Sequence, residues 1–162
     1  MKTSETWESL GELLARGGIY YSLPGKSCRE ALEALVAAAP VLPAVPAQNL
    51  LQAVLEREAL MSTSIGQGIA IPHPRNPLVN KPEEQFVALA FLEQPIDWNA
   101  LDGKPVDTLL LIVSSSAKSH LRTLSRITFI CREESFLKLI KEKAPREILI
   151  SFIKDTEKKW EV

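Results

Sequence analysis

The sequence has few of the residues that build several common kinds of site. Of its 162 residues, two are cysteine and two are histidine. Cys28 and Cys131 lie far apart in the chain, so they form neither a disulfide framework nor the paired spacing of a metal site. Lys and Arg number 19 against 20 Asp and Glu, and a net charge of −1 attracts neither a phosphate backbone nor an anionic lipid surface. The charge balance therefore argues against a general nucleic-acid or membrane-surface binder.

Long hydrophobic runs are lacking as well. The longest stretch without a polar side chain, residues 34–47, contains three prolines and is too short to span a bilayer. Glu5 and Glu8 interrupt the N-terminal region, so we expect no secretory signal. Hydrophobic residues make up 46% and charged residues 24% of the chain, which is the balance of a folded protein. We therefore expect a single cytoplasmic domain over residues 1–162, without membrane insertion.

Hydrophobic periodicity and turn residues predict the element order helix, strand, two helices, three strands and three helices. The expected helices cover about residues 5–16, 27–39, 46–59, 119–131, 133–142 and 145–155. The expected strands cover about residues 19–23, 69–71, 86–92 and 108–113. Ser27 and Glu30 have the spacing of a capping box at the start of the second helix. In the helix over 119–131, the residues expected to face the core are Leu121, Leu124, Ile127 and Cys131.

The two longest apolar runs define the fold class. Residues 86–92 and 108–113 do not alternate cleanly between apolar and polar side chains. Strands of this kind are covered on both faces, whereas a half-exposed strand alternates. Helices on both sides of a small mixed β-sheet are the economical way to cover them. The sequence therefore predicts an α/β fold with three layers, in which helices flank both faces of the sheet.

One segment, residues 62–75, concentrates the chemistry of the chain and reads STSIGQGIAIPHPR. A glycine turn feeds a short apolar strand that ends in His73, which lies between two prolines. Pro72 fixes its own φ, and Pro74 disfavours the helical region for the residue before it. His73 is therefore held in an extended geometry at a strand end, where loops carry function. Such a restricted histidine suits a nucleophile.

This segment resembles the active-site signature of the enzyme IIA domains of the bacterial phosphotransferase system. The resemblance is to the fructose/mannitol class, and particularly to its nitrogen-regulatory members. The family pattern has a Ser-Thr, a Gly-x-Gly turn, Ile-Ala-Ile/Val-Pro-His and then commonly a glycine. Further segments that agree in order are residues 55–60, 92–97, 102–107 and 119–121. The resemblance covers residues 19–155, implies the enzyme IIA type-2 fold, and leaves an extra N-terminal helix within residues 1–18.

The resemblance implies a phosphocarrier, which is a transferase component. His73 would accept a phosphoryl group from the phosphohistidine of the carrier protein HPr. His120 corresponds to the second histidine of the family, at the start of a helix, and Arg57 corresponds to its catalytic arginine. Both would stabilise the negative charge that a metaphosphate-like transition state spreads over three oxygens. The resemblance implies no metal and no cofactor, and the downstream partner is a IIB domain or a regulatory target protein.

Three further residues are candidates for partner binding. Arg75 follows His73 by two residues and can help to dock the donor, or it can be a solvated loop charge. Gly66 and Gly68 can approach a partner closely, or they can simply form a turn, because a lone Gly-x-Gly pattern is weak evidence. Pro74 departs from the family pattern, since it stands where a glycine is usual. Proline lacks the backbone N–H that could donate to a bound phosphoryl oxygen.

Several functions therefore remain open. The preferred hypothesis is a phosphocarrier with a nitrogen or metabolic regulatory role. A sugar-specific enzyme IIA that passes its phosphoryl group to a IIB cysteine is an alternative. A pure interaction module without phosphoryl chemistry is another, and Pro74 is the residue that favours it. A metal-dependent hydrolase built on His73 and His120 fits poorly, because no Asp, Glu or His cluster accompanies either histidine in the sequence.

Overall fold

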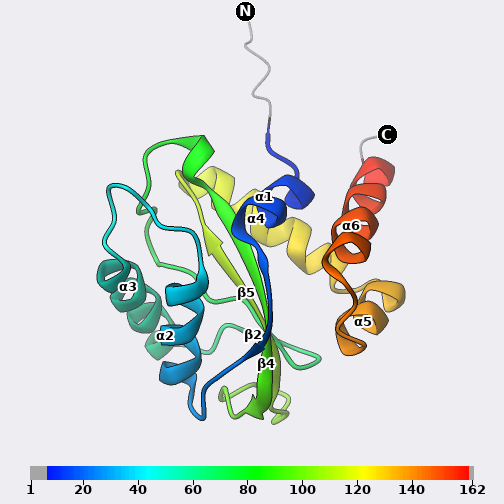
Figure 1. Cartoon of the computed structure of the whole chain (residues 1–162), viewed down its shortest axis with the longest axis horizontal. Helices are drawn as coiled ribbons and strands as arrows, with labels where there is room; N and C mark the ends of the chain where they lie inside the picture. Colours follow the sequence, from blue (N-terminus) through cyan, green and yellow to red (C-terminus); the bar gives the residue numbers. More distant parts are fainter. Residues whose placement is uncertain (1–6, 161–162) are drawn as a thin grey trace, which may run out of the picture.

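A five-stranded sheet lies between two groups of helices (Figure 1). The computed structural model describes residues 7–160 of the chain. The strands are β1 (Ile19–Leu23), β2 (Ser64–Gly66), β3 (Ile69–Ala70), β4 (Phe86–Ile96) and β5 (Val106–Val113). The helices are α1 (Leu10–Gly17), α2 (Cys28–Ala38), α3 (Ala47–Leu60), α4 (Ala117–Ile130), α5 (Glu134–Lys141) and α6 (Arg146–Trp160), with a 3-10 turn at Pro82–Glu84. None of these helices has the length and apolarity that a bilayer crossing requires.

The sheet is mixed, with the strand order β1-β4-β5-β3-β2. β4 pairs antiparallel with β5, while β1 runs parallel to β4 and β3 runs parallel to β5. Both central strands are buried along the apolar runs seen in the sequence. The prediction that helices cover both faces of the sheet is therefore confirmed.

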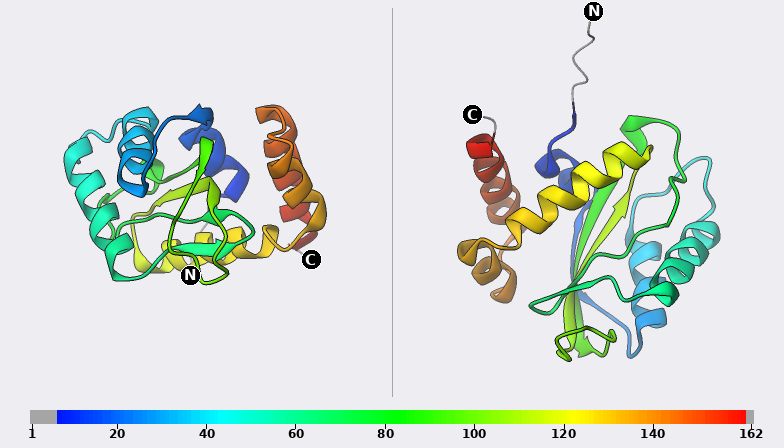
Figure 2. Two further views of the ribbon diagram at one scale, coloured as in Figure 1. Left: turned by 90° about the horizontal axis from the view of Figure 1, so that it is seen from below. Right: turned by 180° about the vertical axis from the view of Figure 1, so that it is seen from behind.

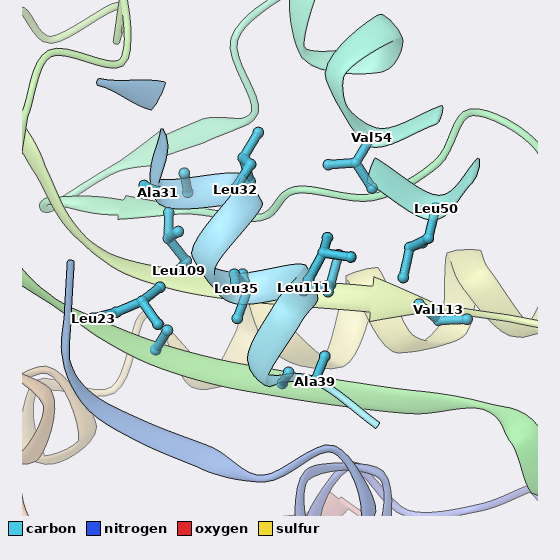
Figure 3. Close-up of a cluster of buried hydrophobic side chains, with 14 of the residues drawn as sticks. Leu23, Ala31, Leu32, Leu35, Ala39, Leu50, Val54, Leu109, Leu111 and Val113 are labelled. Atoms are coloured by element: carbon cyan, nitrogen blue, oxygen red, sulfur yellow. The ribbon is translucent and has the colours of Figure 1, made fainter. Parts of the chain in front are cut away.

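Two hydrophobic cores, one on each face of the sheet, hold the layers together. The side chains of α2 and α3 meet those of β5 in the first core, as Figure 3 shows. Helices α1, α4, α5 and α6 cover the opposite face (Figure 2) and contribute to the second core. Each Leu or Ile side chain that is fully buried stabilises the fold by about 1.5–3 kcal/mol, because its apolar surface is removed from water. The sheet therefore forms a rigid base whose edges can hold a site.

The N-terminal helix is shorter than the sequence pattern predicts. α1 begins at Leu10, and residues 7–9 are not helical; residues 5 and 6 lie outside the described part of the chain. Ser9 accepts a hydrogen bond from the Glu12 N–H, and the Glu12 carboxylate accepts one from the Ser9 N–H. This capping box is the physical reason for the later start.

The predicted box at the start of α2 forms only in part. The Ser27 hydroxyl accepts a hydrogen bond from the Glu30 N–H as expected, at 3.1 Å. The Glu30 carboxylate, however, accepts from the Lys26 N–H at 2.8 Å. The helix is still capped, but the return bond goes to the residue before the N-cap.

Two other predictions are wrong in detail. Residues 64–66 form a strand, β2, that the sequence pattern did not predict. Leu121 was expected to face the core, yet its side chain is 64% exposed. The other three expected residues do face the core, since Ile127 and Cys131 are buried and Leu124 packs against the second core. Ser119, Thr123 and Ile130 of α4 are buried as well. Short hydroxyl side chains lie at the start of the helix, so its apolar leucine is left at the surface.

Candidate functional site

The sheet topology brings two distant segments to one edge. β3 and β5 run parallel, so their carboxyl ends meet at the same edge of the sheet. His73 lies three residues after β3, and α4 begins four residues after β5. The Ile112 N–H of β5 donates to the Pro72 carbonyl at 3.1 Å, which continues the pairing up to the histidine. Both histidines of the chain therefore lie at this edge.

His120 lies in the first turn of α4. The Ser116 side chain caps the helix by accepting a hydrogen bond from the Ser119 N–H at 3.1 Å. The backbone N–H of His120 already donates to the Ser116 carbonyl at 3.0 Å, so this residue offers its imidazole rather than its amide. The rings of His73 and His120 have centroids 4.6 Å apart and are tilted by 43°. The two predicted histidines thus form a contacting pair.

The hydrogen bond of His73 defines its tautomer. Its Nδ1 lies 2.8 Å from the Ile71 carbonyl oxygen, and a carbonyl can only accept a hydrogen bond. Nδ1 therefore carries the proton in the neutral ring, and Nε2 keeps its lone pair. The nitrogen that can act as a nucleophile is Nε2 of His73.

Burial keeps both imidazoles neutral. It is the main cause that lowers the pKa of His73; the Arg57 charge lowers it further, while the Ile71 hydrogen bond and the Glu58 charge oppose this effect. Burial also lowers the pKa of His120 to about 4, with contributions from His73 and Arg57. Both rings are therefore uncharged near pH 7, which is the state that a nucleophilic imidazole needs.

The end of α3 supplies the nearby charges. Arg57 donates from Nη1 to the Met61 carbonyl at 2.7 Å, which fixes its guanidinium at the end of the helix. The next residue, Glu58, accepts from the Thr63 N–H and from the Thr63 Oγ1, both at 2.6 Å. Neither Glu58 nor Thr63 is among the site residues expected from the sequence. The only signal for Glu58 was its place within the segment 55–60.

The predicted partner-binding residues lie in two places. Arg75 is exposed and lines a cavity of about 220 Å³ together with Pro74 and His120. Gly66 and Gly68 lie in the β2–β3 hairpin with φ of 86° and 76°, values that favour glycine. Gly68 precedes His73 by five residues, or roughly 16 Å of extended chain. The structure therefore places Arg75 in one cavity with His120 and the two glycines at the other end of β3.

Trp98 and Cys28 do not belong to this site. Trp98 is 3% exposed and belongs to the first core, so it packs rather than facing the site. Burial and the Glu58 charge raise the pKa of the Cys28 thiol to about 12, which makes it an unreactive thiol. Over residues 7–160, no three His, Cys, Asp or Glu side chains gather where they could hold a metal ion.

Comparison with known proteins identifies the family. The pattern of the family described as "Phosphoenolpyruvate-dependent sugar phosphotransferase system, EIIA 2" matches residues 12–156. A nitrogen regulatory protein of Bradyrhizobium diazoefficiens is 31% identical over 144 residues, covering 88% of this chain and 92% of the relative. A nitrogen regulatory protein of Escherichia coli K12 is 32% identical over 163 residues, covering 97% and 96%.

A solved structure agrees with these relatives. The nitrogen regulatory protein IIA-Ntr of Neisseria meningitidis superposes with a TM-score of 0.77 at 26% identity, covering 88% of this chain and 97% of that one. The predicted three-layer α/β fold is therefore confirmed, and so is the predicted family. The chain belongs to the EIIA type-2 family of the phosphoenolpyruvate-dependent sugar phosphotransferase system, and it is a phosphotransfer component of that system.

Proposed function

We propose that the protein is a phosphocarrier that accepts a phosphoryl group on Nε2 of His73 from an HPr-type donor. The observation that carries this proposal is the 2.8 Å contact between His73 Nδ1 and the Ile71 carbonyl. This contact leaves the lone pair of Nε2 available, and burial keeps the ring neutral. A neutral imidazole with a fixed tautomer is prepared to attack phosphorus near pH 7.

The transfer exchanges one phosphorus–nitrogen bond for another. The lone pair of His73 Nε2 forms the new bond to phosphorus, while the bond to the donor imidazole breaks and its electron pair stays on the donor nitrogen. The proton stays on Nδ1 of His73 throughout, hydrogen-bonded to the Ile71 carbonyl. Since both sides hold phosphohistidine, the exchange is nearly balanced in energy. The protein therefore contributes alignment and charge stabilisation.

His120 and Arg57 would supply that stabilisation. The imidazole of His120, with its centroid 4.6 Å from that of His73, is neutral and has one N–H to donate to a phosphoryl oxygen. The guanidinium of Arg57 stays charged and can hold two oxygens with its planar fork. Its hydrogen bond to Met61 limits its mobility. Arg75, on the rim of the cavity beside His120, would contact the donor.

A regulatory role is the preferred use of the phosphoryl group. The relatives that cover nearly the whole chain are called nitrogen regulatory proteins, and this supports the same role here. Phosphorylation of His73 would add negative charge next to His120, which lines one cavity with the exposed Leu121. A target protein that binds this face would therefore distinguish the two states.

The first experiment is an intact-mass measurement after incubation with phosphoenolpyruvate, enzyme I and HPr. We expect an acid-labile gain of one phosphoryl group in the wild type and none in His73→Ala. A His120→Ala variant should still be labelled, but more slowly. No gain in the wild type with a cognate HPr would refute the phosphocarrier and favour an interaction module.

A second experiment separates the regulatory protein from a sugar-specific enzyme IIA. The phosphorylated protein is mixed with purified IIB domains of the fructose and mannitol classes, and the label on each chain is followed by mass. A regulatory protein should retain the label. Rapid transfer to a IIB cysteine would identify the protein as the sugar-specific form.

A further inference from the structure

We propose that Glu58 is a positioning residue that sets the tautomer and the basicity of His73 through Thr63 and Ile71. This inference rests on the proposed role of His73 as the phosphoryl acceptor. Glu58 does not touch the reacting atoms in this arrangement. It acts through three successive hydrogen-bonded steps that connect the end of α3 to the imidazole.

The steps are continuous. Both oxygens of the Glu58 carboxylate accept from Thr63, one from the N–H and one from Oγ1, each at 2.6 Å. The Thr63 carbonyl in turn accepts from the Ile71 N–H at 3.0 Å. The Ile71 carbonyl then accepts from Nδ1 of His73 at 2.8 Å. The peptide groups of Thr63 and Ile71 therefore lie between a charged anchor and the catalytic ring.

The strength of the first step favours this role. A carboxylate that accepts two short hydrogen bonds forms stronger interactions than a neutral acceptor. Thr63 is buried, so these bonds compete little with water. Ile71 follows directly from a strand of two residues, so the bond to Thr63 on one side adds to the Ile112 bond at Pro72 on the other in holding the acceptor carbonyl in place.

The position of Glu58 is otherwise unfavourable. It lies in the last turn of α3, which ends at Leu60, where the helix dipole disfavours a negative charge. A residue that opposes its local rule is expected where the site requires it. The Glu58 charge also raises the pKa of His73, against burial and Arg57. Glu58 therefore acts on the ring by position and by charge.

The test compares Glu58→Gln with Glu56→Gln. The control removes an exposed carboxylate on the same helix, which accepts a hydrogen bond from Gln52. The imidazole tautomers and pKa values are measured by ¹⁵N–¹H NMR, and the initial rate of phosphorylation is measured over a range of phospho-HPr concentrations. In Glu58→Gln we expect a lower pKa of His73 and a smaller fraction of the Nδ1–H tautomer. The maximal rate should fall roughly ten- to a hundred-fold at an unchanged KM.

Substitutions of Thr63 separate the effect of the Glu58 charge from the effect of its hydrogen bonds. Thr63→Val keeps the Glu58 charge but removes one hydrogen bond, so it should slow the reaction, and Thr63→Ser should restore it. These variants also decide the matter if Glu58→Gln does not fold. The titratable and charged groups that act on His73 are Arg57 and Glu58 of α3 and His120 of α4, and Arg57 and His120 are kept in every variant.

The proposal is overturned if Glu58→Gln and Thr63→Val leave the tautomer and pKa of His73 as in Glu56→Gln. A loss of rate with an unchanged tautomer and pKa would likewise indicate a merely structural role. If the wild type accepts no phosphoryl group, the proposed function fails, but the NMR comparison still tests the positioning by Glu58.

Discussion

Protonation of His120 should destabilise the folded protein in mild acid. The pKa of this side chain is lowered from 6.5 to about 4, with burial as the main cause. Because the folded pKa lies below the unfolded one, the unfolded chain binds more protons in this range. The stability is therefore complete above pH 6.5 and is lost as the pH falls through 6.5 toward about 4. The stabilisation that a carboxylate with a lowered pKa contributes is also lost in acid, but as the pH falls below its unfolded pKa of about 4.

The magnitude follows from the two pKa values. At pH 5, a pKa of 6.5 in the unfolded chain and about 4 in the folded chain shift the folding equilibrium by a factor of about 30. This factor corresponds to about 2 kcal/mol at 25 °C. At pH 7.5 the same group contributes almost nothing to the pH dependence, so the difference between these two pH values contains nearly its whole contribution.

The assay is urea unfolding of the wild type and of His120→Gln at pH 7.5 and pH 5.0. Both proteins share the other titrating groups, and the pKa of His73, whose ring contacts that of His120, is measured by NMR in each so that its contribution can be subtracted. We expect the wild type to lose about 2 kcal/mol more than the variant. NMR gives a direct check, because the chain has two histidines and each single variant assigns the other. Equal losses, or a His120 midpoint near 6.5, would refute the buried neutral pair.

Three further predictions concern single substitutions. Arg57→Lys keeps the charge but loses the planar fork, so the rate of phosphoryl acceptance should fall roughly tenfold or more, while the imidazole pKa values are retained. The rate is followed by intact mass, and an unchanged rate would contradict a two-oxygen contact. Pro74→Gly supplies a backbone N–H after the acceptor, so we expect a longer-lived phosphohistidine and a stability loss of about 1 kcal/mol; a lifetime equal to wild type would show that no N–H is needed there. Glu157 is 3% exposed and pairs with Arg126 at 2.6 Å. Glu157→Gln should lower the free energy of unfolding in urea by about 3 kcal/mol, whereas Glu147→Gln, at an exposed position, should change it little.

The layers of the fold could be predicted because they depend on long apolar patterns. The strands β4 and β5 have apolar runs that no half-exposed strand would carry. The strand β2 has three residues and only one apolar side chain, Ile65, which is exposed. Its pairing with β3 depends on the positive φ angles of Gly66 and Gly68, which a search for alternating hydrophobicity cannot detect. Short strands that are stabilised by a turn therefore cannot be predicted from hydrophobic periodicity.

Parts of the site were predictable and parts were not. His73 was marked by its flanking prolines, and His120 came from the resemblance to the family. Glu58 was missed because its partner, Thr63, lies beyond the end of α3. The hydrogen bond between them forms where the chain leaves the helix, and it leaves no periodic pattern in the sequence. Leu121 was placed wrongly although Ile127 and Cys131 of the same stripe are buried, because helical spacing does not show how far along a helix the core extends.

The prolines and the hydrogen bonds act together on the acceptor. Pro72 and Pro74 restrict the backbone around His73, so the remaining freedom of the ring is rotation about its side-chain bonds. The bond from Nδ1 to the Ile71 carbonyl removes much of that freedom. Two backbone hydrogen bonds hold the peptide groups next to that carbonyl. The Ile71 N–H donates to the Thr63 carbonyl, and the Ile112 N–H donates to the Pro72 carbonyl. The orientation of the nucleophile is therefore set by the strands on either side, and substitutions that loosen these pairings should slow transfer without touching the phosphoryl group.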